Sequence, residues 1–203
     1  KVLGFEELEK LDSYGRYLDS DNDGICYRTY PGTHPEKGAY FTRGTSHDEY
    51  ARYTEDGNIN AETLMRLMRK FRTASELVPP PIIEINGEDS CGIIYYGSSK
   101  PAVLEAKDIL KTKDINVDLM QIRSFPFNLD VWEFIASHDR IYVVEQNRDS
   151  QMRTLIMAEG GISAEILRPL VHFTGDPIEA SYIVNKISER EVNYKSHKNI
   201  KER

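Results

Sequence analysis

Short apolar runs alternate with helical patterns throughout the second half of the chain, and this alternation limits the possible folds more than any other feature. The clearest case is residues 141–152, where a β-branched run ends in five polar residues and a helical pattern then begins. Such a change is typical of a buried parallel strand that leads into a helix. Strands that alternate with helices indicate a mostly parallel α/β sheet, covered on both faces.

The remaining elements of this sheet follow from local patterns. Two apolar runs flank Asn86-Gly87, which predicts a hairpin and makes one strand antiparallel. Further strands are expected at residues 117–122, 141–145 and 166–173, and helices at 100–111, 129–137, 150–159 and from Asp176 onward. We therefore expect a three-layer, Rossmann-like open sheet over residues 79–189, with Pro169 near an edge. The charged residues 190–203 are expected to form a disordered tail.

The first 78 residues lack this regularity. Residues 12–58 are rich in Gly, Pro, Tyr and charge, and a loop that long is uncommon unless it is functional or wraps another surface. A helix is expected over residues 60–72, capped by Asn60 and basic on one face. Its apolar stripe comprises Leu64, Leu67, Met68 and Phe71. The run Pro79-Pro80-Pro81 is a stiff spacer and predicts a domain boundary.

Composition excludes several classes of protein. The 203 residues are 39% hydrophobic and 29% charged, as in an ordinary globular protein. A net charge of −7 argues against nucleic acid as a partner. No apolar run reaches membrane-spanning length and no signal-peptide pattern opens the chain, so we expect no membrane partner and a cytoplasmic location. Cys26 and Cys91 are too few for a disulfide framework or an iron–sulfur cluster. The chain begins with Lys1 rather than Met, which suggests a piece of a longer protein.

Polar side chains gather at the predicted carboxyl ends of the strands. Ligands meet open α/β sheets at this edge, and helix N-termini there offer backbone N–H groups to anions. The residues predict either a phosphate or carboxylate site or a subunit interface. Alternatively, Ser99 and Asp149 cap helices, and Glu145 pairs with Arg148. The candidates are Gly97, Ser98, Ser99, Arg123, Glu145, Gln146, Asn147 and Arg148.

An acidic turn near the start of the chain copies the first half of a calcium-binding loop. Asp19, Asp21 and Asp23 stand at alternate positions, and Gly24 follows at the bend. The twelfth position, which needs a bidentate Glu, is Tyr30. A turn whose Asp side chains bind their own backbone is therefore favoured over a calcium site.

The irregular segment also concentrates residues with catalytic-type side chains. His47 with Asp48 or Glu49 could form an acid–base pair, and His34 with His47 and a carboxylate could bind zinc, but neither set has diagnostic spacing. We favour a wrapping loop whose side chains hydrogen-bond to exposed backbone. The candidate contacts are Arg28, Thr33, His34, Arg43 and His47.

Two long passages resemble a known family. Residues 31–56 and 143–153, supported by residues 92–99, are similar to the C-terminal part of the alpha subunit of 2-oxoacid:ferredoxin oxidoreductases, particularly the 2-oxoglutarate type (2-oxoglutarate synthase). The likeness covers nearly the whole chain. It implies that residues 79–189 form a transketolase C-terminal-like domain. It also implies that residues 1–78 are the tail of a thiamine-pyrimidine-binding domain with a linker segment.

The resemblance further implies a parent enzyme that decarboxylates a 2-oxoacid to an acyl-CoA. That enzyme uses thiamine diphosphate and Mg²⁺, and it passes electrons through iron–sulfur clusters to ferredoxin. The family's motifs for thiamine and diphosphate, and its cluster cysteines, are missing from this chain. We therefore carry over no catalytic residue and expect no cofactor or metal here. The expected role is a non-catalytic assembly part, inactive alone, that contacts thiamine- and cluster-bearing subunits. The alternative is a stand-alone module that binds a phosphate-bearing ligand such as CoA at the strand edge.

Overall fold

A five-stranded sheet organises residues Pro79–Arg203, which form one of the two units of the chain; the other is Lys1–Val78. This computed structural model describes the backbone of residues 1–86 and 91–201, with side chains described up to residue 192. The strands lie in the order β1-β3-β2-β4-β5, and β1 pairs antiparallel with β3 while all other pairs are parallel. They are β1 (Ile82–Glu84), β2 (Cys91–Tyr96), β3 (Asp118–Ile122), β4 (Arg140–Glu145) and β5 (Leu167–Val171). The expected mostly parallel sheet with one antiparallel strand is confirmed.

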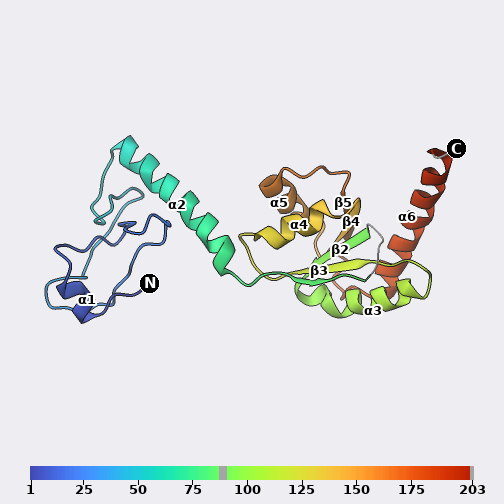
Figure 1. Cartoon of the computed structure of the whole chain (residues 1–203), viewed down its shortest axis with the longest axis horizontal. Coiled ribbons are helices and arrows are strands. Elements are labelled where there is room, and N and C mark those ends of the chain that lie inside the picture. Colours follow the sequence, from blue (N-terminus) through green and yellow to red (C-terminus); the bar gives the residue numbers. More distant parts are fainter. Residues whose placement is uncertain (87–90, 202–203) are drawn as a thin grey trace. The chain divides into compact units, whose positions relative to one another are not determined.

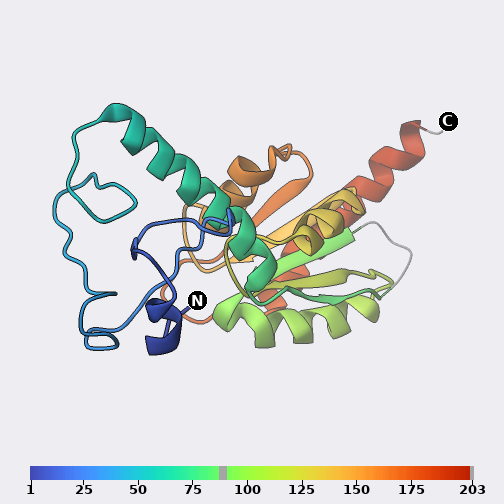
Figure 2. The ribbon, with the colours of Figure 1, turned by 60° about the vertical axis from the view of Figure 1, so that its left-hand side comes forward.

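Helices cover both faces of this sheet, which makes the three layers that the sequence predicts. One core packs α3 (Lys100–Lys111) and α6 (Ala180–Lys201) on one face, and a second packs α4 (Leu129–Ala136) and α5 (Gln151–Gly160) on the other. Figures 1 and 2 show α3 opposite α4 and α5 across the sheet. In β4, Tyr142 and Val144 join the first core, and Ile141 and Val143 join the second. Burial on both faces explains the continuous apolar run of that strand.

The predicted hairpin around Asn86 is wrong. Strand β1 pairs with β3, while β2 lies in the sheet interior between β3 and β4. The Asn86 N–H donates to Asp118 at 2.6 Å, and its side-chain amide donates to the Val117 carbonyl at 3.1 Å. These bonds tie the end of β1 to the start of β3. Gly87, the other turn residue, lies outside the described residues.

The last helix also differs from its prediction. It begins at Ala180 rather than near Asp176, and the Ile178 N–H just before it donates to the Gln146 side chain at 3.2 Å. It continues to Lys201, so the predicted disorder from residue 190 is wrong for residues 190–201. Glu191 is 1% exposed and pairs with buried Arg140 at 2.8 Å, which fixes the helix at the point where a tail was expected.

Strand β5 forms one edge of the sheet, as its proline predicts. Pro169 lies in the middle of this strand and has no N–H to donate. The Arg190 guanidinium of α6 donates to the Pro169 carbonyl at 2.9 Å. The helix on the sheet face thus also holds the edge strand.

Unit 1, all of whose residues the structure describes, is mainly irregular. Its helices are α1 (Phe5–Glu9) and α2 (Gly57–Leu77), and isolated bridges join Val2 to Arg28 and His47 to Tyr53. Leu8 and Ala51 are the only hydrophobic residues in this unit that are buried. The predicted irregular segment is confirmed, and it encloses almost no core.

Helix α2 is longer than predicted and exposes the stripe that its pattern suggested would pack. Asp56, not Asn60, is its N-cap, accepting from the Asn58 N–H at 2.8 Å. None of its 21 residues is buried. Within residues 1–86 and 91–201, no helix combines the length and apolar character needed to cross a membrane.

Candidate functional site

Glu145 is the centre of the predicted site at the carboxyl ends of the strands. It is the last residue of β4 and is fully buried. Its carboxylate accepts the N–H groups of Met152 at 2.8 Å and Arg153 at 3.0 Å, in the first turn of α5, and the Asn147 amide at 2.8 Å. Helix N-termini attract anions because their first N–H groups lack partners. The chain therefore supplies its own anion to the position where a phosphate would bind.

The next two residues, Gln146 and Asn147, hydrogen-bond to neighbouring segments of unit 2. The Gln146 amide nitrogen donates to Ser98 at 2.9 Å and Ser99 at 3.3 Å, while its oxygen accepts from Ile178. Asn147 also donates to the Tyr96 hydroxyl at 3.3 Å. The pKa of that phenol is raised, first by burial and then by the nearby Glu145 carboxylate. Loops after β2, β4 and β5 are thus joined to each other, and the predicted gathering of polar groups at this edge is present.

Arg148 and Arg123 are the predicted residues that still point outward. Arg148 forms a two-pronged pair with the adjacent Asp149, at 2.7 and 3.1 Å, and its side chain is 74% exposed. The alternative of a Glu145–Arg148 pair is therefore wrong. Arg123 is exposed and donates to the Pro80 carbonyl at 3.5 Å. Gly97 has a φ of +57° and open space where a Cβ would lie. These three residues are exposed, whereas Glu145 is fully buried and bonded to its own chain.

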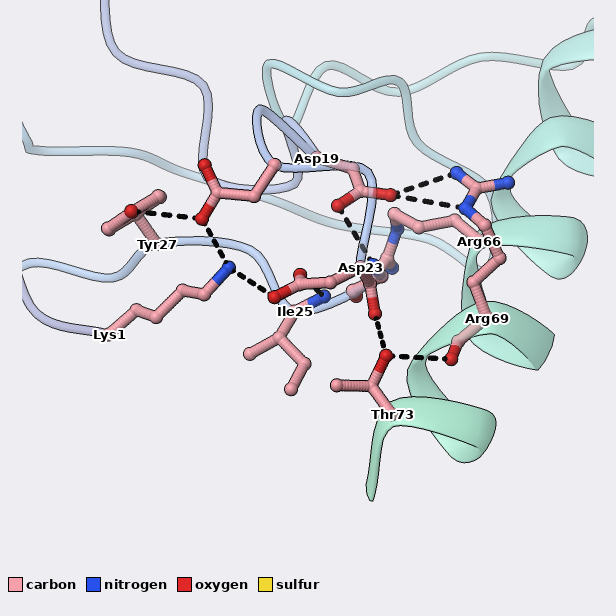
Figure 3. Close-up of polar contacts among 10 residues, drawn as sticks. Lys1, Asp19, Asp23, Ile25, Tyr27, Arg66, Arg69 and Thr73 are labelled. Carbon is pink, nitrogen blue, oxygen red and sulfur yellow. Dashed lines mark hydrogen bonds and ion pairs between the residues drawn. The ribbon is translucent and has the colours of Figure 1, made fainter. Parts of the chain in front are cut away.

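The acidic turn forms the second cluster, in unit 1 (Figure 3). Asp19 accepts the Gly24 N–H at 2.9 Å, and its other oxygen accepts the Arg69 guanidinium of α2 at 2.9 Å. Asp23 accepts the Ile25 N–H at 2.8 Å. Gly24 has a φ of +79°, and a Cβ there would lie 2.2 Å from a backbone nitrogen of α2. The turn therefore binds its own backbone and packs directly against the helix.

The cation that satisfies the remaining carboxylates is the Lys1 ammonium. It lies 2.6 Å from both Asp21 and Asp23, and it lowers the pKa of each carboxyl. Among the described residues, no group of three or more His, Cys, Asp and Glu side chains is placed to hold a metal ion. Sequence reasoning missed Lys1 and Arg69 as partners of the turn. The basic face of α2 was the available signal, since it complements a run of three Asp residues.

Comparisons with known proteins identify relatives of this chain. No protein-family model matches the chain. It is 28% identical over 185 residues to subunit alpha of 2-oxoacid:ferredoxin oxidoreductase 2 from Aeropyrum pernix, a match that covers 87% of this chain and 28% of that protein. The 2-oxoacid:ferredoxin oxidoreductase subunit alpha of Saccharolobus solfataricus is 28% identical over 124 residues, or 59% of this chain and 20% of that protein. The chain is related to 2-oxoacid:ferredoxin oxidoreductase alpha subunits.

A solved structure has the same fold as this chain over most of its length. The 2-oxoglutarate:ferredoxin oxidoreductase from Magnetococcus marinus, solved with 2-oxoglutarate, coenzyme A and succinyl-CoA bound, matches with a TM-score of 0.77 and 23% identity. That match covers 89% of this chain and 31% of the other. The family resemblance expected from the sequence is thus confirmed. The chain spans 28% and 20% of the lengths of its two named relatives.

Residues 31–56, one of the passages on which the predicted resemblance rests, contain the predicted His contacts. His34 is 8% exposed; its Nδ1 accepts the Lys37 N–H at 2.9 Å, and its Nε2 contacts Glu9 at 2.9 Å. This bond lowers the pKa of Glu9. Because Nδ1 faces a donor, the proton lies on Nε2 and points to Glu9. His34 thus joins α1 to the loop.

The other histidine of this alpha-subunit-like passage has different neighbours. His47 stacks on Tyr17 at 3.8 Å between ring centres, and its Nδ1 lies 3.2 Å from the Asp48 carbonyl. The Asp48 carboxylate instead accepts the N–H groups of Tyr50 and Arg52. Neither the acid–base pair nor a shared zinc site with the other histidine forms.

The remaining predicted loop contacts are weaker. Arg28 is exposed and joins Lys1 and Leu3 through its backbone. Arg43 is exposed and lies 5.9 Å from the centre of the Tyr53 ring, while the Thr33 N–H closes a turn onto the Tyr30 carbonyl. The structure does not bring these residues together into one site.

Proposed function

We propose that this chain is a non-catalytic structural part of a 2-oxoacid:ferredoxin oxidoreductase alpha subunit. Unit 2 (79–189 with the rest of α6) would be its transketolase C-terminal-like domain, and unit 1 (1–78) the tail of a thiamine-pyrimidine-binding domain with a linker. The observation that carries the proposal is the engagement of Glu145, Gln146 and Asn147 with the chain itself. Relatives named as subunits support an assembly role for this fold.

The proposed parent reaction is the oxidative decarboxylation of a 2-oxoacid to an acyl-CoA, with electrons passed to ferredoxin. We favour 2-oxoglutarate as the 2-oxoacid, because the Magnetococcus relative is a 2-oxoglutarate enzyme. Thiamine diphosphate, Mg²⁺, the iron–sulfur cluster and CoA would be held by other parts of this cytoplasmic, oligomeric enzyme. The strand edge does not fit a diphosphate, because Glu145 fills the anion position at the start of α5.

Binding of CoA or another phosphate-bearing ligand at the strand edge is the less favoured function. A relative was solved with coenzyme A bound, but here the N-terminus of α5 already holds a carboxylate. Calorimetric titration of the chain with CoA tests this directly. We expect no measurable heat of binding, and micromolar affinity would favour the ligand-binding module over the purely structural role.

Co-expression tests the proposed function. The chain is produced together with candidate thiamine- and cluster-bearing chains, and 2-oxoglutarate-dependent ferredoxin reduction is measured with and without it. We expect the complex to assemble and reduce ferredoxin only when this chain is present. Full activity in its absence would refute the assembly role. The variant Arg148→Ala tests the exposed residue after the strand edge as a subunit contact. We expect this variant to weaken assembly more than it lowers the stability of unit 2.

A further inference from the structure

Helix α2 turns its polar face toward its own chain. The Arg66 guanidinium donates to the Gly24 carbonyl at 3.0 Å, and Arg69 pairs with Asp19. The Thr73 hydroxyl donates to the Asp23 carbonyl at 2.6 Å. Figure 3 shows these side chains reaching from the helix into the acidic turn. In a globular protein, the face that packs inward is normally the apolar one.

The apolar side of α2 is therefore left on the opposite side. At 100° per residue, Leu64 and Met68 lie nearly half a turn away from the helix face that Arg66 and Thr73 occupy. Both are 54% exposed, and Leu67 between them is partly exposed. The stripe residues Leu64, Leu67 and Met68 thus lie away from the acidic turn. Helices of this length gain most of their stability from packing such a face, so the stripe predicts a covering surface.

The rest of unit 1 indicates what kind of partner would cover it. Unit 1 buries only Leu8 and Ala51 among its hydrophobic residues, while Phe41 and Tyr30 of the irregular segment are 81% and 61% exposed. A second copy that paired through the stripe alone would leave these loop aromatics uncovered. A single helix pair is also small beside the roughly 800 Å² per partner that stable interfaces bury. A larger, different partner accounts for both surfaces.

We propose that the apolar stripe of α2 docks on an apolar surface of the thiamine-bearing partner of this chain. This inference rests on the proposed function, which makes unit 1 the tail of a thiamine-pyrimidine-binding domain. The acidic turn is then the device that holds α2 in place before docking. Its bonds to Arg66, Arg69 and Thr73 engage the polar face and leave the stripe free of charge.

The test compares lysine substitutions on one helix. Leu64→Lys and Met68→Lys place a charge in the stripe, and Glu76→Lys places the same side chain on an exposed position outside it. All three positions are exposed, so the urea midpoint of the isolated chain, followed by circular dichroism, should stay unchanged. Binding to the co-expressed thiamine-bearing chain should weaken by about ten-fold or more for each stripe variant and less than about two-fold for the control.

Each other outcome overturns the inference in a recognisable way. Equal binding by all three variants would refute the stripe as the docking surface and leave the proposed function standing. A lower urea midpoint for Leu64→Lys would show that the stripe packs within this chain. Self-association of the chain that the stripe variants abolish would show that the occupant is a second copy. Absence of binding by the unsubstituted chain would refute the proposed function together with the inference.

Discussion

The substitution Glu145→Gln tests whether the chain's own carboxylate fills the anion position at the start of α5. The change keeps the side chain's size and removes its charge. Glu145 accepts N–H groups from Met152 and Arg153, one on each oxygen. A glutamine has one acceptor oxygen, so one of these donors would face an NH₂ group instead.

The expected loss follows from these contacts. Hydrogen bonds to a charged acceptor contribute about 1.5–3 kcal/mol each, and a buried donor left unpaired costs a similar amount. With one bond weakened and one lost, unit 2 should lose about 2–4 kcal/mol of its free energy of unfolding. At a urea slope of about 2 kcal/mol per M, the middle of the usual range, the midpoint should fall by about 1–2 M.

The sole tryptophan gives the assay its specificity. Trp132 lies on α4 and contacts Phe127 in the second core, so its fluorescence follows the unfolding of unit 2 alone. Arg148→Ala is the matched control, because its exposed pair with Asp149 should change stability by less than about 0.5 kcal/mol. Equal midpoints for Glu145→Gln and the unsubstituted chain would show that the Glu145 carboxylate does not hold the start of α5.

Three further predictions concern a glycine of the acidic turn, a buried ion pair and an exposed ion pair. Gly24→Ala should release the acidic turn from α2, because Gly24 has a positive φ and lies against the backbone of that helix. The free energy of unfolding of unit 1, followed by circular dichroism, should fall by about 2–4 kcal/mol. Glu191→Ala should destabilise unit 2 by about 3–5 kcal/mol, because it removes the carboxylate that pairs with the buried Arg140 guanidinium. Arg140→Met in the same chain should restore much of this loss in a fluorescence-monitored titration. The Lys1 ammonium holds the pKa of Asp21 below its usual 3.8, so this ion pair stabilises the turn above about pH 4 and is lost as the pH falls through the lowered value. Lys1→Met should remove that acid-dependent step in hydrogen exchange of the turn.

Much of unit 2 was predictable because its patterns are local. Helix α3 occupies the predicted residues 100–111, and β4 extends the predicted strand by one residue. The hairpin at Asn86 failed because the turn signal describes two neighbouring residues, whereas the bonds of Asn86 reach Val117 and Asp118. Strand partners are set by such distant contacts, which a local pattern does not contain.

The sequence identified residues that gather at the strand edge, but it did not predict the hydrogen bonds that they make. The sequence placed Glu145, Gln146 and Ser98 at one edge, and they do meet there. That Glu145 bonds to α5 depends on the loop between them, where Ser150 adopts a φ of +51°. For α2, the pattern identified an apolar stripe correctly, but amphipathicity does not state whether the covering surface belongs to the same unit.

Strand β5 has a consequence for how unit 2 meets other proteins. An open edge strand is a template on which a further strand can pair, whether from a partner or from an aggregating copy. Pro169 withholds a donor from β5, and Arg190 occupies the proline's carbonyl. At the opposite edge, β1 offers only three residues. Both edges are poor templates, so partners of unit 2 should be recognised through its helices and loops, and the sheet is protected against extension into aggregates.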